Sequence, residues 1–158
     1  MSLIDQLVEA RTSIVDEAAQ EVHAMELLHY AQAGPEFTRQ RIDDLYGLVL
    51  AAVTDRDLGQ VVHYAEAVAE ERFNAGFDVF EVQTAFNALE ALTWRHVVAV
   101  TPADELAESI GLVSTVFGVA KDALSRAYVS LATHRHVRSL DLSALFRGVT
   151  STVPYEAD

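Results

Sequence analysis

Histidines and carboxylates are the residues of this 158-residue chain that could hold a metal ion. Glu26 and His29 form an E-x-x-H pair, the unit that di-iron bundles use twice, with further glutamates, on facing helices. The pair occurs once here, and His134 and His136 fall on different faces of a helix. The spacing predicts no metal site and no cofactor, although six histidines do not exclude haem, whose iron needs one proximal histidine.

Residues for nucleophilic catalysis do not occur in a known arrangement. The chain has no G-x-S-x-G motif, serines such as Ser114 fall inside a predicted helix, and no glycine-rich loop follows a strand. Adjacent carboxylates such as Glu70 and Glu71 are typical of solvated helix faces. We predict that the chain is not an enzyme, and a metal-dependent enzyme built on Glu26 and His29 is the least supported alternative.

Arg72 is a charged residue whose position suggests either binding or support of the fold. It lies one helical turn before Gly76, near the start of the next predicted helix. It could pair with Glu81 or Glu90 and hold two helices together, which is the interpretation we favour. It could instead bind an anion in a cavity.

Aromatic residues are concentrated in the same part of the sequence. The walls of a sensory pocket are apolar and aromatic, and so is the core of a helical bundle, which is the default interpretation. If a pocket for a small apolar ligand exists, Arg72, Phe86 and Trp94 are the residues that we predict to line it.

The elements that position these residues are predicted to be helices. Apolar periodicity and breakers indicate five main helices, over residues 3–33, 36–54, 58–75, 79–100 and 101–134. The first is expected to end at Gly34 and Pro35, and to break near Thr12 and Ser13, which are weak helix formers. No β-alternation is seen. We predict an all-α fold, either an antiparallel helical bundle or a globin-like array of about five main helices.

The turn around Gly76 carries three agreeing signals. Gly76 suits the left-handed residue that ends a helix, and Asp78 with Glu81 has the spacing of a capping box. Phe77 and Val82 occupy the two positions of a hydrophobic staple. Capping residues predict three further helix starts: Ser2 with Asp5, Asp57 with Gln60, and Thr101 before Pro102.

The fifth predicted helix carries small residues along one face, among them Gly111, Ser114 and Gly118. A glycine inside a helix costs about 1 kcal/mol relative to alanine, so close approach of another helix should compensate. That helix could belong to the same chain or to a second copy, and the two alternatives stay open.

The composition of the chain limits the functions and the cellular compartment that it fits. The formal charge of −13 and the pI of about 4.7 disfavour binding to nucleic acid or to an anionic membrane. There is no cysteine, which fits a cytoplasmic protein. We predict one domain over residues 1–150, including a short helix over 142–147, and a frayed polar tail over 151–158.

The stretch A-E-E-R-F-N-A-G-F-D-V-F-E-V-Q-T-A-F-N-A-L-E-A-L-T-W-R, residues 69–95, resembles the N-terminal domain of RsbR-type co-antagonists, the RsbRD N-terminal family. In that family an arginine precedes a glycine and a later helix ends near a tryptophan, as Arg72, Gly76 and Trp94 do here. Residues 29–45 also look like the preceding family segment, and the resemblance covers residues 3–132.

The resemblance implies a non-enzymatic sensory or regulatory domain of bacterial signalling. RsbR relatives carry a globin-like dimer without haem, attached to a STAS domain, in stressosome control of an alternative sigma factor. After Leu142 too few residues remain for such an output module, so we expect either a free-standing sensor or a fragment. The expected partners are a second copy and a signalling protein; a haem-binding or small-molecule sensor is the alternative.

Overall fold

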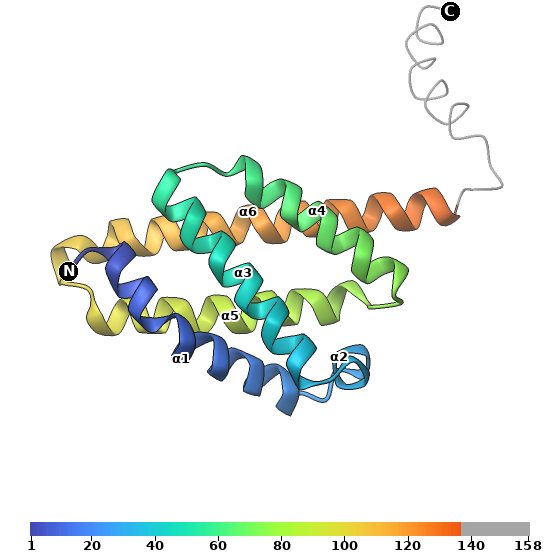
Figure 1. Cartoon of the computed structure of the whole chain (residues 1–158). Coiled ribbons are helices and arrows are strands. Elements are labelled where there is room, and N and C mark those ends of the chain that lie inside the picture. The colour runs from blue at the N-terminus through green and yellow to red at the C-terminus, as the bar shows by residue number, and fades with distance from the viewer. Residues whose placement is uncertain (137–158) are drawn as a thin grey trace, which may run out of the picture.

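The computed structural model describes residues 1–136, with side chains described to Thr133. The predicted helix over 142–147, the tail over 151–158 and the end of the predicted domain at 150 lie outside these residues. The described part is all-helical, as predicted, and contains six helices (Figure 1): α1 (Leu3–Ala24), α2 (Leu28–Ala33), α3 (Pro35–Asp55), α4 (Gly59–Asn74), α5 (Val79–Val100) and α6 (Ala103–His136).

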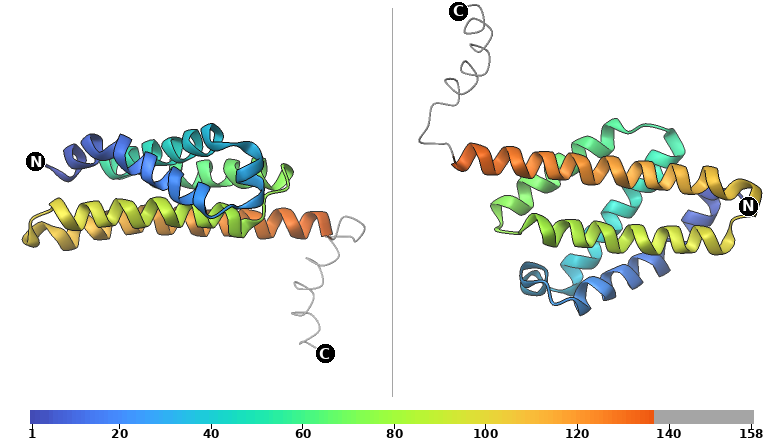
Figure 2. Two further views of the ribbon diagram at one scale, coloured as in Figure 1. Left: turned by 90° about the horizontal axis from the view of Figure 1, so that it is seen from below. Right: turned by 180° about the vertical axis from the view of Figure 1, so that it is seen from behind.

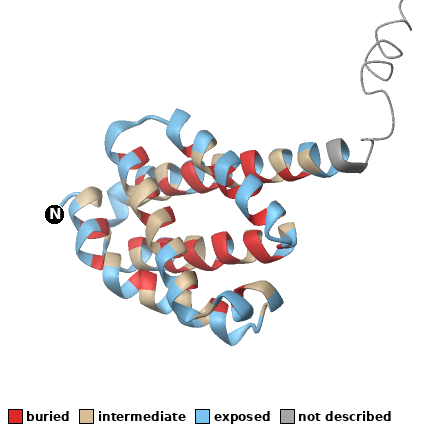
Figure 3. Cartoon of the chain, turned by 45° about the vertical axis from the view of Figure 1, so that its right-hand side comes forward, coloured by how far each residue is buried: buried red, intermediate tan, exposed pale blue. Residues whose placement is uncertain are grey.

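The helices form two layers. The antiparallel pair α5 and α6 makes one layer, and α1, α3 and α4 lie across one side of it (Figure 2). The most extensive contacts join α4 to α6, α1 to α3, and α1 to α5. Buried residues follow the sides of the helices that face each other (Figure 3). None of the helices in the described part is long and apolar enough to cross a membrane.

The predicted first helix is two helices, and the break lies elsewhere than expected. Helix α1 continues without interruption through Thr12 and Ser13, and it ends at Ala24. The chain then turns at Glu26, which has a φ of 52° and therefore lies in the left-handed region. Helix propensity at Thr12 and Ser13 was too weak a signal, because the apolar face on both sides of them is buried in the core.

Apolar residues at helical spacing line the core on the other long helices. Helix α3 buries Ile42, Leu45, Val49 and Val53, α5 buries Val82, Phe86, Leu89 and Val97, and α6 buries Val113, Phe117 and Leu124. Ser2 and Asp5 form the predicted capping box. The capping box predicted for Asp57 and Gln60 is wrong. Helix α4 begins after Leu58 without a side-chain cap, and Asp57 accepts a hydrogen bond from the Gly59 amide at 2.8 Å instead.

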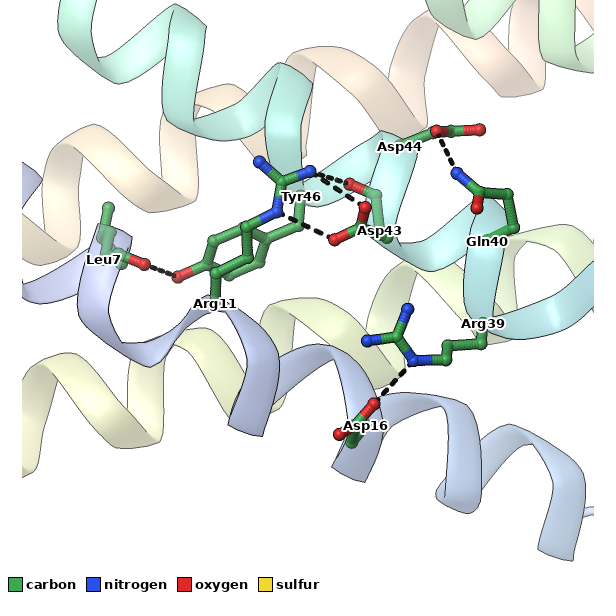
Figure 4. A network of polar contacts seen from close by, with 8 residues as sticks. All are labelled: Leu7, Arg11, Asp16, Arg39, Gln40, Asp43, Asp44 and Tyr46. Carbon is green, nitrogen blue, oxygen red and sulfur yellow. Dashed lines mark hydrogen bonds and ion pairs between the residues drawn. The ribbon is translucent and has the colours of Figure 1, made fainter. Parts of the chain in front are cut away.

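Two ion pairs and one buried hydrogen bond fasten α1 to α3 (Figure 4). Arg11 makes two parallel bonds to the Asp43 carboxylate, at 2.8 and 3.0 Å, and a third to the Asp43 carbonyl at 3.3 Å. The buried Tyr46 hydroxyl donates to the Leu7 carbonyl at 2.7 Å. Because of the bonds from Arg11, the pKa of Asp43 lies below its usual value, with burial opposing the shift.

The substitution Asp43→Asn should lower the free energy of unfolding by about 1 kcal/mol at neutral pH, since it breaks a two-bonded arginine–carboxylate pair. The matched control is Asp16→Asn. Asp16 pairs with Arg39 through one bond between half-exposed side chains. Its loss should cost no more than about 0.5 kcal/mol. Urea unfolding monitored by circular dichroism would measure both variants, and equal losses would contradict the role given to Arg11.

Candidate functional site

The turn between α4 and α5 is built as its sequence predicts. Gly76 has a φ of 89° and donates to the Phe73 carbonyl at 3.1 Å, and the Phe77 amide donates to the Arg72 carbonyl at 2.9 Å. These two bonds make a Schellman motif. Asp78 and Glu81 then form the predicted capping box of α5. The turn thereby fixes where the side chains of Arg72 and Phe77 lie.

Arg72 lies in a cluster of aromatic rings and charges from three helices and this turn. Its guanidinium carbon is 4.8 Å from the centre of the Phe37 ring and 5.6 Å from that of Phe77. Arg41, one turn after Phe37 on α3, lies 5.1 Å from the same Phe37 ring. Tyr30 packs edge-on against Phe77 at 4.9 Å. We call the following residues the arginine–aromatic cluster: Tyr30, Phe37, Arg41, Glu71, Arg72 and Phe77.

The charge of Arg72 is buried, with 2 % of the residue exposed. A carboxylate oxygen of Glu71 lies 2.6 Å from one guanidinium nitrogen of Arg72 and 3.5 Å from Arg41, so it bridges both cations. Glu71 itself is half-exposed, and the Nε atoms of both arginines are buried without a hydrogen-bond partner. The aromatic faces therefore supply much of the stabilisation that solvent would give a cation.

The predicted partners of Arg72 are wrong. Glu81 binds His29, and Glu90 pairs with Lys121 across α5 and α6, so neither pairs with Arg72. The physical reason is the direction of the side chains. The Schellman turn places Arg72 toward α3, whereas Glu81 lies in the first turn of α5, where its carboxylate closes the capping box on Asp78. The structure gives Arg72 a position inside the packed core, and Arg72 lines none of the clefts described for residues 1–136.

Glu81 caps two helices at once. One carboxylate oxygen accepts from the Asp78 amide at 2.9 Å, within the capping box of α5. The other accepts from the His29 amide, also at 2.9 Å, in the first turn of α2, whose own N-cap residue Leu27 has no side-chain cap. His29 Nδ1 lies 2.7 Å from Glu81, and because a carboxylate only accepts, this nitrogen donates. Glu81 thus ties the start of α2 to the start of α5.

Burial raises the pKa of Glu81, but the bonds from His29 and Asp78 outweigh burial and leave the pKa below the ordinary glutamate value of 4.5. A carboxyl group with a depressed pKa in the folded state stabilises the fold above its unfolded pKa. That contribution is lost as the pH falls below about 4.5 and through the lower folded value.

Replacing Glu81 with glutamine should lower the free energy of unfolding at pH 7 by about 2 kcal/mol, because an amide cannot accept all three bonds. The difference between the variant and the parent should shrink as the pH falls from 5 toward 3. Thermal unfolding at several pH values would measure it. A difference that stays constant over this range would contradict the role of the ionised carboxylate.

The packing and the charge of Arg72 can be separated by two substitutions. Arg72→Ala leaves a cavity beside Phe37 and Phe77 and should cost about 3 kcal/mol or more. Arg72→Met keeps most of the apolar volume and removes a buried charge whose Nε is unsatisfied, so its cost should be clearly smaller. Chemical denaturation of both variants is the measurement. If Arg72→Met lowers the free energy of unfolding as much as Arg72→Ala, the prediction is wrong, and the charge rather than the packing of Arg72 stabilises this corner.

The three predicted ligand-lining residues differ in how far they are buried. Arg72 and Phe86 are buried in the core, whereas Trp94 is 43 % exposed. Two clefts of the described part have volumes of about 420 and 410 Å³, and neither is lined by Arg72, Phe86 or Trp94. The first lies between α4 and α6, and the second is lined by residues of α1, by Met1 and by the last turns of α5.

One side of the α5–α6 layer is not covered by any other helix of the described part (Figure 2). Gly111, Ser114 and Gly118 are exposed, and a Cβ atom added at either glycine would meet nothing within 4 Å. Close approach of another described helix therefore does not explain these glycines.

The register of the two helices places Trp94 beside these small residues. Gln83 donates to Ser125, and Lys121 donates to Asn87 at 3.1 Å, so α5 and α6 run antiparallel. Trp94 is two turns after Asn87, and Ser114 is two turns before Lys121, which brings them to the same level of the layer. We call the exposed side of α5 and α6 around Trp94, Val98, Gly111, Ser114 and Gly118 the outer face.

The E-x-x-H pair is not assembled into a metal site. Glu26 is exposed in the turn after α1, and His29 Nδ1 is bound to Glu81. Among the described residues, no group of three or more histidine, aspartate or glutamate side chains could hold a metal ion. The side chains of His134 and His136 are outside the described set.

Sequence reasoning missed Phe37, Arg41 and Glu71 of the arginine–aromatic cluster and the contact of His29 with Glu81. One local signal existed, since Phe37 and Arg41 are four residues apart and share a helix face. The contacts of Arg72 with Phe37 and of His29 with Glu81 join residues 35 and 52 positions apart, and nothing in the local pattern indicates which helices meet. A comparison with known proteins finds no family model, curated protein or solved structure that matches this chain.

Proposed function

We propose that this chain is a non-enzymatic regulatory domain that acts by pairing with a second copy through the outer face of α5 and α6 and by presenting the paired form to a signalling protein. The observation that carries the proposal is the outer face itself. It combines a large exposed aromatic side chain, Trp94, with a flat strip at Gly111 and Gly118 that has open space above it. Close helix packing across this strip offsets the cost of two glycines inside a helix.

The charge of the outer face fits pairing of identical chains. A chain with a net charge of −13 repels its own copies. Along α6, however, the charged residues between Ser109 and Thr133 are Lys121, Asp122 and Arg126, so this stretch carries no excess of acid. Lys121 is paired with Glu90, and Arg126 with Asp122. Two copies can therefore approach on this face without strong repulsion.

The proposed mechanism is a shift between two packings of the helices. Helix α5 is clamped at its start by Glu81 and carries Trp94 two turns before its end. A signal that moved α2 or α4 at the arginine–aromatic cluster would therefore change how α5 presents the outer face. A partner that prefers one arrangement would select it. The resemblance to the RsbRD N-terminal family supports a globin-like arrangement and a role in stress-response signalling as part of this proposal.

Replacing Gly118 with leucine should weaken self-association without unfolding the chain. A Cβ atom at position 118 meets nothing within 4 Å among the described residues, and the substitution removes up to about 1 kcal/mol of glycine cost from the helix. Sedimentation equilibrium should show the parent chain as a dimer and the variant shifted toward monomer. Circular dichroism should show unchanged helix content in the variant.

The matched control is Ala67→Leu, which adds a leucine at an exposed position on α4, away from the outer face. This control should remain a dimer. A parent chain that is monomeric at high micromolar concentration, or a Gly118→Leu variant that pairs as well as the control, would contradict the proposal. Native mass spectrometry of the protein as purified tests the sensor alternative, which requires a stoichiometric added mass.

A further inference from the structure

A groove between α4 and α6 lies apart from the outer face and is not filled by any described residue. It has a volume of about 420 Å³. Its floor is apolar, formed by Val62, Ala123, Ala127 and Leu131, and Glu66 and Glu70 stand along its α4 rim. The α6 wall of the groove reaches to within five residues of His136, where the described part of the chain ends.

We propose that this groove, the α4–α6 groove, is the docking site of the chain's own segment 142–147, which binds as a short helix. In the sequence of that segment, Leu142, Leu145 and Phe146 recur at i, i+3 and i+4, so a helix would place all three on one side. A helix of six residues is not stable in water by itself. An apolar groove that buries this side supplies the missing stabilisation, in the manner of a helix bound in a groove.

The length of chain between α6 and the segment suits a return along α6. Leu131 is five residues before His136, about 8 Å along the helix, and Ala123 is about 20 Å before it. The five residues 137–141 can span up to about 17 Å when extended. The segment can therefore turn back at the end of α6 and lie antiparallel to it over the α4–α6 groove, as in a helical hairpin.

Charge also favours this occupant. The α4 rim offers the exposed carboxylates of Glu66 and Glu70, and Arg126 on the α6 wall is already paired with Asp122. Residues 137–147 carry Arg138 and Arg147 against one acid, Asp141, in a chain with a net charge of −13. A basic segment next to an acidic rim is attracted to it, whereas most other segments of this chain would be repelled.

The absence of cysteine from the sequence allows a direct test by disulfide trapping in the full chain. The test pair is Ser130→Cys with Leu145→Cys, because Ser130 lines the α4–α6 groove. The matched control is Val129→Cys with Leu145→Cys, since Val129 is exposed at the same level of α6 but about 100° around the helix. Single-cysteine chains, alkylated with a maleimide, correct for differences in thiol reactivity.

If the segment docks in the α4–α6 groove, the chain with cysteines at 130 and 145 should form an intrachain disulfide several-fold faster than the chain with cysteines at 129 and 145. Both rates are first corrected for the reactivity of the single thiols. Adding Phe146→Asp should abolish the preference, and circular dichroism should confirm that each variant keeps its helix content. Equal rates for the two pairs would overturn the proposal. Disulfides that join two chains would also overturn it and would assign the α4–α6 groove to the segment of a second copy. The result does not depend on pairing through the outer face.

Discussion

The burial of Arg72 is the constraint on which this fold depends. A guanidinium removed from water needs compensation on every side, and here it comes from the rings of Phe37 and Phe77 and from the bridging carboxylate of Glu71. These groups belong to α3, α4 and the turn before α5. The corner where α2, α3, α4 and α5 meet is therefore held mainly by packing of the rings around the Arg72 side chain, while Glu71 balances its charge.

Glu81 connects this corner to the start of α2 and to the start of α5. Its carboxylate completes the first turn of α5 and also that of α2, which has no cap of its own. The His29 ring meanwhile lies over Gly76, with Nε2 3.5 Å from where a Cβ atom would be. A single acidic side chain thus sets the start of two helices and the fit of the turn between α4 and α5. The short α2, which could not persist alone, is held in place by it.

The same architecture leaves two surfaces without a partner in the described chain. Because α1, α3 and α4 all lie on one side of α5 and α6, no described helix covers the opposite side (Figure 2). The exposed residues Trp94, Gly111 and Gly118 belong to the outer face. The α4–α6 groove is open on its own side. A rigid corner with two open surfaces suits a protein that works through contacts.

Sequence alone was enough for the all-helical class, for the approximate range of most long helices and for the turn at Gly76, because periodicity, capping and a glycine's tolerance of positive φ act over a few residues. It missed the break between α1 and α2, which depends on how the core packs. The sequence indicated that Arg72 lies near the end of a helix, but it did not indicate which residues surround the guanidinium. It also could not show that Trp94 is exposed or that Gly111 and Gly118 face open space. The exposure of these residues depends on which helices pack against α5 and α6. That arrangement is decided by contacts between residues far apart in the chain. Arg72 and Glu81 stand nine positions apart, and only the tertiary structure turns one toward Phe37 and the other toward His29.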